Sequence, residues 1–78
     1  MYYTYVLRSR SDGKLYIGFC LDLKRRFKEH VSGKVFATKS RLPLDLVYYE
    51  ACLDKKKAVK REKYFKSGFG RRFLKGRI

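Results

Sequence analysis

Two runs rich in tyrosine and other strand-forming residues, separated by a turn signal, constrain the fold of this chain more than any other feature. Residues 2–9 (YYTYVLRS) and 14–19 (KLYIGF) flank the sequence Ser11-Asp12-Gly13, in which Gly13 is free to adopt a positive φ. This pattern predicts a β-hairpin whose side chains alternate between the two faces of the strands.

The length of the hairpin loop decides how Tyr5 and Tyr16 lie relative to each other. A two-residue Asp12-Gly13 turn would offset the two side chains by four positions, or roughly 13 Å along the strands. A four-residue loop from Arg10 to Gly13 would make them a diagonal pair on one face, about 7 Å apart. We favour the longer loop if the two phenols act together.

A helix is expected directly after the hairpin. Asp22 is a candidate N-cap and Gly33 a candidate stop signal, so the helix should cover residues 23–32. Arg26 and His30 lie four positions apart and therefore share one face of this helix.

The second half of the chain predicts a loop, a strand and two more helices. Residues 33–43 are expected to form a basic loop, and residues 44–53 (LDLVYYEACL) have the composition of a third strand. Asp54 is a candidate N-cap for a helix over residues 55–67, and residues 69–78 should form a short terminal helix with a basic outer face.

Glu62 is the unusual residue of the helix predicted over residues 55–67. With Ala58 and Phe65 it lies at positions i, i+4 and i+7, so its carboxylate is predicted to interrupt an inward apolar stripe. Carboxylates rarely occupy such positions unpaired, which marks Glu62 for a partner or a function.

The chain carries a large excess of positive charge on one small domain. Its 78 residues leave room for a single core, and 21 Lys and Arg residues against 7 Asp and Glu residues give a formal net charge of +14. Repulsion among these charges opposes compact folding, so we expect a partner that neutralises them. A nucleic-acid backbone is favoured over an anionic membrane, because the basic residues sit among aromatics along the whole chain and no separate lipid-binding helix is recognisable.

The two cysteines do not predict a disulfide framework or a metal site. Cys20 and Cys52 are expected to be buried thiols on strands, and with His30 they would supply only three of the four ligands of a structural zinc site. No signal peptide or membrane-spanning segment is recognisable, so a cytoplasmic location is expected by default.

Several of these residues occur in the order typical of the GIY-YIG nucleases, and the chain resembles that family, especially its small stand-alone bacterial members. Residues 3–5 (YTY) match the first half-motif at Tyr5 but lack its glycine and isoleucine, and residues 16–18 (YIG) form the second half-motif intact. The family's helix arginine falls eight residues after that glycine, at Arg26, and its next helix position corresponds to His30. The resemblance covers nearly the whole chain.

The resemblance implies an α+β fold with a three-stranded antiparallel sheet flanked by helices. It also implies metal-dependent cleavage of phosphodiester bonds with Mg²⁺ or Mn²⁺. The family's metal-binding glutamate matches Glu62 within KREKYFKSG, and the ending GFGRRFLKGRI is similar to that of the stand-alone members. An asparagine that some members place near the phosphate has no counterpart, because this sequence contains no asparagine.

The implied roles follow the needs of phosphodiester hydrolysis. Glu62 would hold a hard cation that keeps most of its waters, and Arg26 would stabilise the charge on the phosphate. Tyr5 or Tyr16 would orient or deprotonate the attacking water, although a phenol pKa near 10 must fall for efficient base catalysis. His30 would hydrogen-bond a tyrosine or the phosphate.

Each of these residues also has a purely structural interpretation. Glu62 could pair with Arg61 or Arg26, and Arg26 could be an ordinary basic helix residue. The two tyrosines could be half-buried strand aromatics, and His30 could be a satisfied core residue. The sequence leaves these alternatives open.

Nucleic-acid contacts are expected from basic side chains and from one glycine at a strand end, where close approach of backbone or substrate is possible. These residues are Lys14, Gly18, Lys34, Lys39, Arg41, Arg71 and Arg72.

Two hypotheses about function result. The first is a small metal-dependent endonuclease acting on DNA, either structure-selective or weakly specific, in a family whose members serve repair, restriction and mobile-element transfer. The second is a non-catalytic nucleic-acid-binding module on the same fold. We expect the partner to be DNA, branched or single-stranded, with RNA as the alternative, no membrane partner, and a monomer or a weak homodimer.

Overall fold

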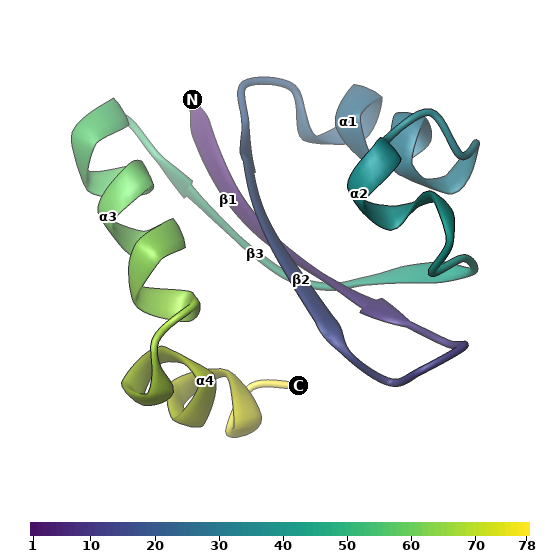
Figure 1. Cartoon of the computed structure of the whole chain (residues 1–78). Helices are drawn as coiled ribbons and strands as arrows, with labels where there is room; N and C mark the ends of the chain where they lie inside the picture. Colours follow the sequence, from purple (N-terminus) through teal and green to yellow (C-terminus); the bar gives the residue numbers. More distant parts are fainter.

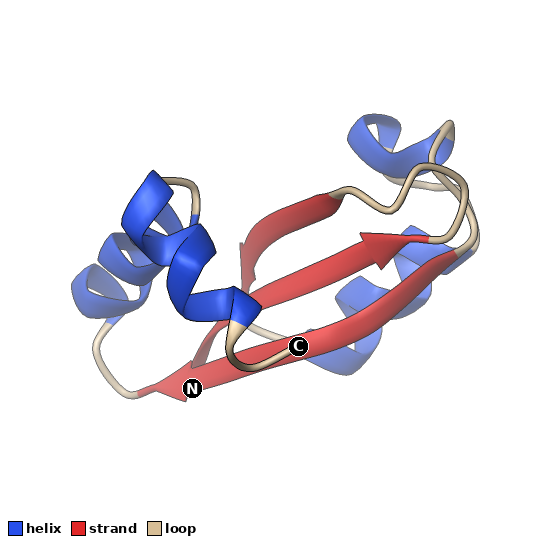
Figure 2. Ribbon diagram, turned by 90° about the horizontal axis from the view of Figure 1, so that it is seen from below, coloured by secondary structure: helices blue, strands red, loops and turns tan.

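A three-stranded antiparallel sheet with helices on both faces makes up the protein, seen in a computed structural model that describes residues 1–78 (Figure 1). The sheet order is β2-β1-β3, so the two outer strands are edge strands (Figure 2). This is the predicted α+β architecture. The elements follow one another as β1 (Tyr2–Ser9), β2 (Leu15–Cys20), α1 (Leu23–Val31), α2 (Phe36–Lys39), β3 (Leu44–Cys52), α3 (Lys55–Phe65) and α4 (Gly68–Lys75).

The hairpin between β1 and β2 has the four-residue loop that would bring the two tyrosines together. The backbone N–H of Ser9 donates to the carbonyl oxygen of Lys14 at 3.0 Å, which closes the loop. In this register Tyr5 lies opposite Gly18, and Tyr16 lies opposite the residue two positions after Tyr5. The two phenol rings therefore form the predicted diagonal pair, with ring centroids 6.4 Å apart.

Alternation along β1 divides the core into two layers. Tyr5 and Leu7 face α1 and pack with apolar residues of that helix, whereas Val6 points to the opposite face and packs with Phe65 of α3 and Leu74 of α4. Figure 1 shows the consequence: α1 and α2 lie on one side of the sheet, and α3 and α4 lie on the other.

Local capping chemistry sets the helix starts as predicted. The carboxylate of Asp22 accepts a hydrogen bond from the Arg25 N–H at 3.1 Å, and Asp54 accepts one from the Lys57 N–H at 3.2 Å. The helices end one or two residues earlier than expected, at Val31 and Phe65, because their last carbonyls are satisfied by the N–H groups of the residues that follow.

The predicted loop over residues 33–43 contains a short helix, α2, which the sequence did not indicate. Its four residues are too few to show a helical repeat of apolar side chains. Val35 and Thr38 anchor this segment, since both are buried. The two cysteines lie on strands as expected, each at the last residue of its strand, but both are only half-buried, which corrects the prediction of buried thiols.

Candidate active site

A chain of buried polar side chains runs from the centre of the sheet to α2. Tyr5 is 1% exposed, and its hydroxyl oxygen lies 2.7 Å from Nε2 of His30. The other ring nitrogen of His30, Nδ1, lies 2.7 Å from Oγ1 of Thr38. His30 and Thr38 are both fully buried, so the polar side chains of this series make their hydrogen bonds to one another, away from water.

Burial keeps the phenol of Tyr5 and the imidazole of His30 uncharged at neutral pH. It raises the pKa of Tyr5 to about 12, although the nearby Arg26 guanidinium acts in the opposite direction. It lowers the pKa of His30 to about 4, and the positive charge of Arg26 adds to this effect. At neutral pH the imidazole is therefore neutral, with one ring nitrogen donating a hydrogen bond and the other accepting one.

Tyr16 completes an aromatic cluster with Tyr5 and His30 but stays in contact with solvent. Its ring centroid lies 5.2 Å from that of His30 and 6.4 Å from that of Tyr5. Unlike Tyr5, Tyr16 is only half-buried. The structure thus distinguishes two phenols that the sequence left equivalent.

Arg26 lies on the exposed margin of this cluster. Its guanidinium makes a polar contact with Tyr5 that raises the pKa of Arg26, and it donates a hydrogen bond to the Glu29 carboxylate at 3.2 Å. The side chain remains partly open to solvent. It is thus positioned to contact an anion while touching the buried phenol.

Gly18 is needed because the ring of Tyr5 lies directly over it. A Cβ atom at this position would overlap the Cζ atom and hydroxyl of Tyr5. The close approach inferred from the sequence is therefore made by a side chain of the protein itself.

We expect Gly18→Ala to destabilise the fold by about 1–3 kcal/mol, since the buried Tyr5 ring has no free space to move into. Urea denaturation would measure this loss. Gly68→Ala is the matched control, because nothing lies within 4 Å of a Cβ there, and its effect should stay within about 0.5 kcal/mol. Equal effects of the two substitutions would contradict the packing argument.

Helix geometry places Glu62 on the β2 side of α3. Ala58 and Phe65 mark the buried face of this helix, and Arg61 and Glu62 lie about 50° to either side of it. Arg61 donates two hydrogen bonds, of 2.8 and 2.7 Å, to the carboxylate of Glu50 on β3. Glu62 therefore lies on the opposite flank, toward the other edge of the sheet.

The surroundings of Glu62 correct two expectations. The residue is half-buried on the flank of α3 and does not interrupt the buried stripe. It pairs with neither Arg61 nor Arg26; its partner is Lys66, whose ammonium lies 3.4 Å away. Such a long surface pair contributes little to stability. Because α3 packs on the other face of the sheet, no hydrogen bond or ion pair joins Glu62 to Arg26 or the aromatic cluster.

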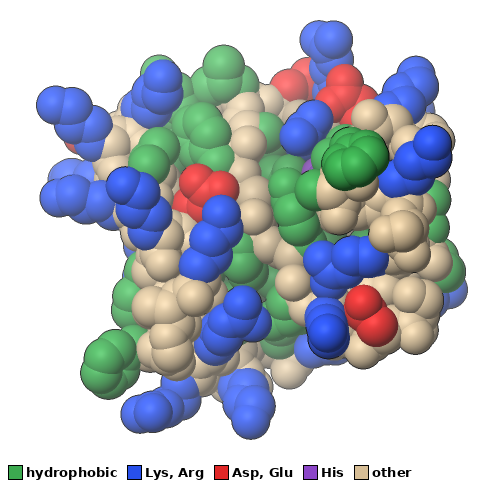
Figure 3. All heavy atoms as spheres, in the orientation of Figure 1, with side chains coloured by type: hydrophobic (Ala, Val, Ile, Leu, Met, Phe, Trp, Pro, Cys, Tyr) green, Lys and Arg blue, Asp and Glu red, His purple; other side chains and the backbone are tan.

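The basic residues expected to contact nucleic acid lie on both sides of the sheet. Lys34 and Lys39 are exposed beside α2, and Arg71 and Arg72 are exposed on α4. Arg41 is less available, since it donates to the carbonyl oxygen of a β2 residue at 3.4 Å and lies near an aspartate of the hairpin loop. Lys14 is exposed directly after the hairpin loop. Figure 3 shows Lys and Arg side chains over both flanks of one face, with few acidic groups among them.

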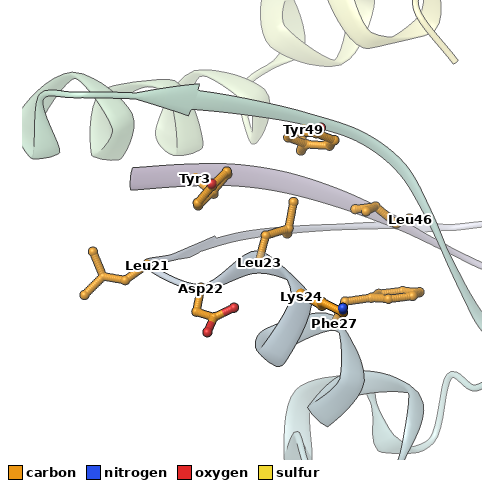
Figure 4. Close-up of a pocket in the computed structure, with 8 residues that line it drawn as sticks. All are labelled: Tyr3, Leu21, Asp22, Leu23, Lys24, Phe27, Leu46 and Tyr49. Carbon is orange, nitrogen blue, oxygen red and sulfur yellow. The ribbon is translucent and has the colours of Figure 1, made fainter. Parts of the chain in front are cut away.

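A groove on the α1 side of the sheet does not coincide with these residues. It has a volume of about 650 Å³ and lies between α1 and the sheet (Figure 4), and Tyr5, Tyr16, Arg26 and His30 are not among its lining residues. Its lining residues are Tyr3, Leu21, Asp22, Leu23, Lys24, Phe27, Leu46 and Tyr49. The described residues hold no group of three or more His, Cys, Asp or Glu side chains that could bind a metal ion together. None of the helices is long and apolar enough to cross a bilayer.

Sequence reasoning missed Thr38 and Glu29 as partners of the predicted residues. Thr38 lies in a segment that gave no helical pattern, so its contact with His30 depends on tertiary folding. Glu29 is three positions after Arg26 on the same helix, and this spacing could have identified the pair.

Comparisons with known proteins add to this geometry. Residues 1–75 match the family model described as the GIY-YIG catalytic domain. A UPF0213 protein of Streptococcus agalactiae is 46% identical over 65 residues, which cover 82% of this chain and 73% of that protein. A UPF0213 protein of Bacillus pumilus is 40% identical over 67 residues, covering 85% of this chain and 67% of that protein. The solution NMR structure of a UPF0213 protein from Bacillus halodurans superposes with a TM-score of 0.61 at 35% identity, covering 97% of this chain and 84% of that one.

Proposed function

Because the chain belongs to the GIY-YIG catalytic domain family, we propose that it is a metal-dependent endonuclease that hydrolyses DNA phosphodiester bonds, with structure-selective or weak sequence specificity. The observation that carries the proposal is the gathering of Tyr5, Tyr16, Arg26 and His30 on one face of the sheet. The net charge of +14 supports a polyanionic substrate.

The different burial of the two phenols supports a division of roles. Tyr16 is half-buried and open to solvent, so it is the phenol that would orient the attacking water or accept its proton. Tyr5 is buried, and its high pKa makes it a poor base. With His30 and Thr38, Tyr5 acts as a positioning residue that fixes the ring of Tyr16 and the guanidinium of Arg26.

Arg26 is the candidate for stabilising charge on the scissile phosphate. Its planar guanidinium can donate two parallel hydrogen bonds to phosphate oxygens while one face stays against Tyr5. Tyr16 lies on β2, an edge strand, and both its ring and the Arg26 guanidinium lie against Tyr5. Lys34 and Lys39 on the same side could contact the flanking backbone.

Glu62 is the candidate ligand for the cation on which this family generally depends. Its chemistry fits, because Mg²⁺ and Mn²⁺ prefer oxygen ligands and a single carboxylate can hold such an ion when waters and a substrate phosphate fill the remaining positions. The long contact with Lys66 engages only one of its two oxygens. When bound, the ion would supply positive charge to the phosphate and the departing oxygen.

Nicking of supercoiled plasmid tests the proposal. The wild-type protein should nick the plasmid in the presence of Mg²⁺ or Mn²⁺, and nicking should cease when the ion is chelated. Arg26→Ala should slow nicking about a hundredfold, the effect of removing one donor that stabilises developing charge. Arg25→Ala is the matched control, because Arg25 lies on the same helix but is mostly exposed and makes only a 3.7 Å contact with Glu29; its nicking rate should be nearly unchanged. Equal nicking by Arg26→Ala and the wild type would contradict the role of Arg26.

A non-catalytic nucleic-acid-binding module is the second candidate. The specific observation in its favour is that Glu62 and Arg26 lie on helices packed against opposite faces of the sheet. Tight, salt-dependent binding without cleavage of branched, flapped or single-stranded substrates, DNA or RNA, would establish this function instead.

A further inference from the structure

Phe36 presents nearly its whole ring to solvent beside the candidate active site. It is 94% exposed, the largest value among the exposed large hydrophobic residues. Val35 and Thr38, on either side of Phe36 in the sequence, are buried and hold α2 against the rest of the protein. The ring packs against no other aromatic residue, so it does not contribute to the core.

The surroundings of the ring are polar and positively charged. Phe36 borders an open hollow of about 500 Å³ whose other lining residues are Ala37, Lys39 and Ser40. Lys34 is exposed two positions before the ring. An aromatic face flanked by cations and a small hollow matches the chemistry of a nucleotide, since the ring can stack on a base while lysines contact phosphates. A protein-binding hot spot would instead need an apolar surround that excludes water.

The short helix that carries Phe36 is joined to the buried phenol through Thr38. Thr38 lies two residues after it on α2 and contacts Nδ1 of His30 at 2.7 Å, and Nε2 of His30 contacts the hydroxyl of Tyr5 at the same distance. Both His30 and Thr38 are fully buried, so this connection is shielded from water. Phe36 and Thr38 are about 200° apart around the helix axis, so Thr38 faces His30 while the ring of Phe36 points outward from the same short helix.

We propose that Phe36 stacks on an unpaired nucleobase of the nucleic-acid substrate, next to the phosphate that lies in the candidate active site. The inference rests on the proposed function and deepens it, because it names the substrate class. Bases inside a duplex already stack on both faces, whereas a flap, a gap or a single strand offers a free face. The protein should consequently favour nucleic acid with unpaired residues near the cut.

A fluorescence experiment detects the stacking directly. The chain contains seven tyrosines but no tryptophan, so Phe36→Trp introduces a single tryptophan, whose selectively excited emission a stacked base should quench. An oligothymidylate should quench it, whereas an abasic oligomer with the same number of phosphates should not. Phe69→Trp is the control at another exposed phenylalanine, 72% exposed on α4, and it should respond equally to both oligomers. Equal responses at position 36 would overturn the proposal.

Binding affinities provide the second test. Phe36→Ala should weaken binding of the oligothymidylate about fivefold to a hundredfold, which corresponds to the stacking of one base on an aromatic ring. Binding of the abasic oligomer and the dependence of affinity on salt should stay unchanged, because the phosphate contacts remain. Phe69→Ala should affect neither oligomer. A thermal melt would verify that each variant is folded.

The outcomes separate this inference from the proposed function. If the wild-type protein binds both oligomers equally well, the stacking role is overturned while the nuclease proposal stands. If it binds neither, the stacking proposal is overturned, and plasmid nicking alone decides the nuclease proposal. If Phe36→Ala leaves binding intact but converts a dimer into a monomer in sedimentation, the ring contacts a second copy of the chain and the stacking proposal is overturned.

Discussion

Glu62→Ala should lower the rate of plasmid nicking about a thousandfold or more. This is the effect expected when a cation that supplies several kcal/mol of transition-state stabilisation loses its protein ligand. Binding of uncut DNA should change little, because Glu62 is one carboxylate in a chain with a net charge of +14. Titration of Mn²⁺ against the nicking rate would show whether a higher ion concentration restores part of the activity.

Lys66→Ala separates the metal-binding role of Glu62 from its surface ion pair. Lys66 is the only residue that pairs with this carboxylate, at 3.4 Å. If Glu62 serves only that pair, the two substitutions should have the same small effect on nicking. If Glu62 holds the cation, Lys66→Ala should leave nicking intact or improve it, since the carboxylate is then free. Full activity in Glu62→Ala would contradict the proposed metal site.

The stability of the protein should fall by about 3 kcal/mol between pH 7 and pH 4 because of His30 alone. Burial, followed by the charge of Arg26, lowers the pKa of His30 to about 4 in the folded state, although Glu29 acts in the opposite direction. In the unfolded chain the pKa is about 6.5. Stability from the neutral imidazole is therefore fully present above pH 6.5 and is lost as the pH falls toward 4.

Urea denaturation at several pH values would measure this dependence. His30→Gln is the informative variant, since glutamine can hydrogen-bond but does not titrate, and its pH profile should be flat between pH 7 and about pH 4.5. The carboxylates of Asp12, Asp45 and Glu50 have lowered pKa values, because of hydrogen bonds from a backbone N–H or from arginines, so their effects begin at lower pH. Parallel profiles for the wild type and the variant would contradict the assignment to His30.

Local chemistry predicted the elements that depend on neighbouring residues. Gly13 has a φ of 72° as the turn requires, and Asp22 and Asp54 cap their helices. The diagonal placement of Tyr5 and Tyr16 was one of two arrangements that the sequence allowed, and the four-residue loop selects it. The turn glycine and the two caps are determined within a few positions of the chain, so a single sequence is enough to derive them.

Features that depend on tertiary packing were not predictable. The segment of α2 has no repeat that signals a helix, and Thr38 gains its role only when α2 folds against His30. The spacing of apolar residues in α3 does not predict which edge of the sheet Glu62 faces, because Arg61 and Glu62 flank the buried face symmetrically. The partner of Arg61 on β3 resolves that choice, and a contact between distant segments is not encoded in local spacing.

The pairing of Arg61 with Glu50 also controls how α3 is turned about its own axis. The guanidinium of Arg61 lies over the rings of Tyr64, Phe65 and Phe73, with its central carbon 4.7 to 5.2 Å from their centroids. At the same time it donates hydrogen bonds to the carboxylate of Glu50 on β3. A helix is rigid over adjacent positions, so fixing one residue orients the next by a constant rotation of about 100°. The ion pair between Arg61 and Glu50, at the β3 edge of the sheet, thus determines the direction in which the carboxylate of Glu62 points.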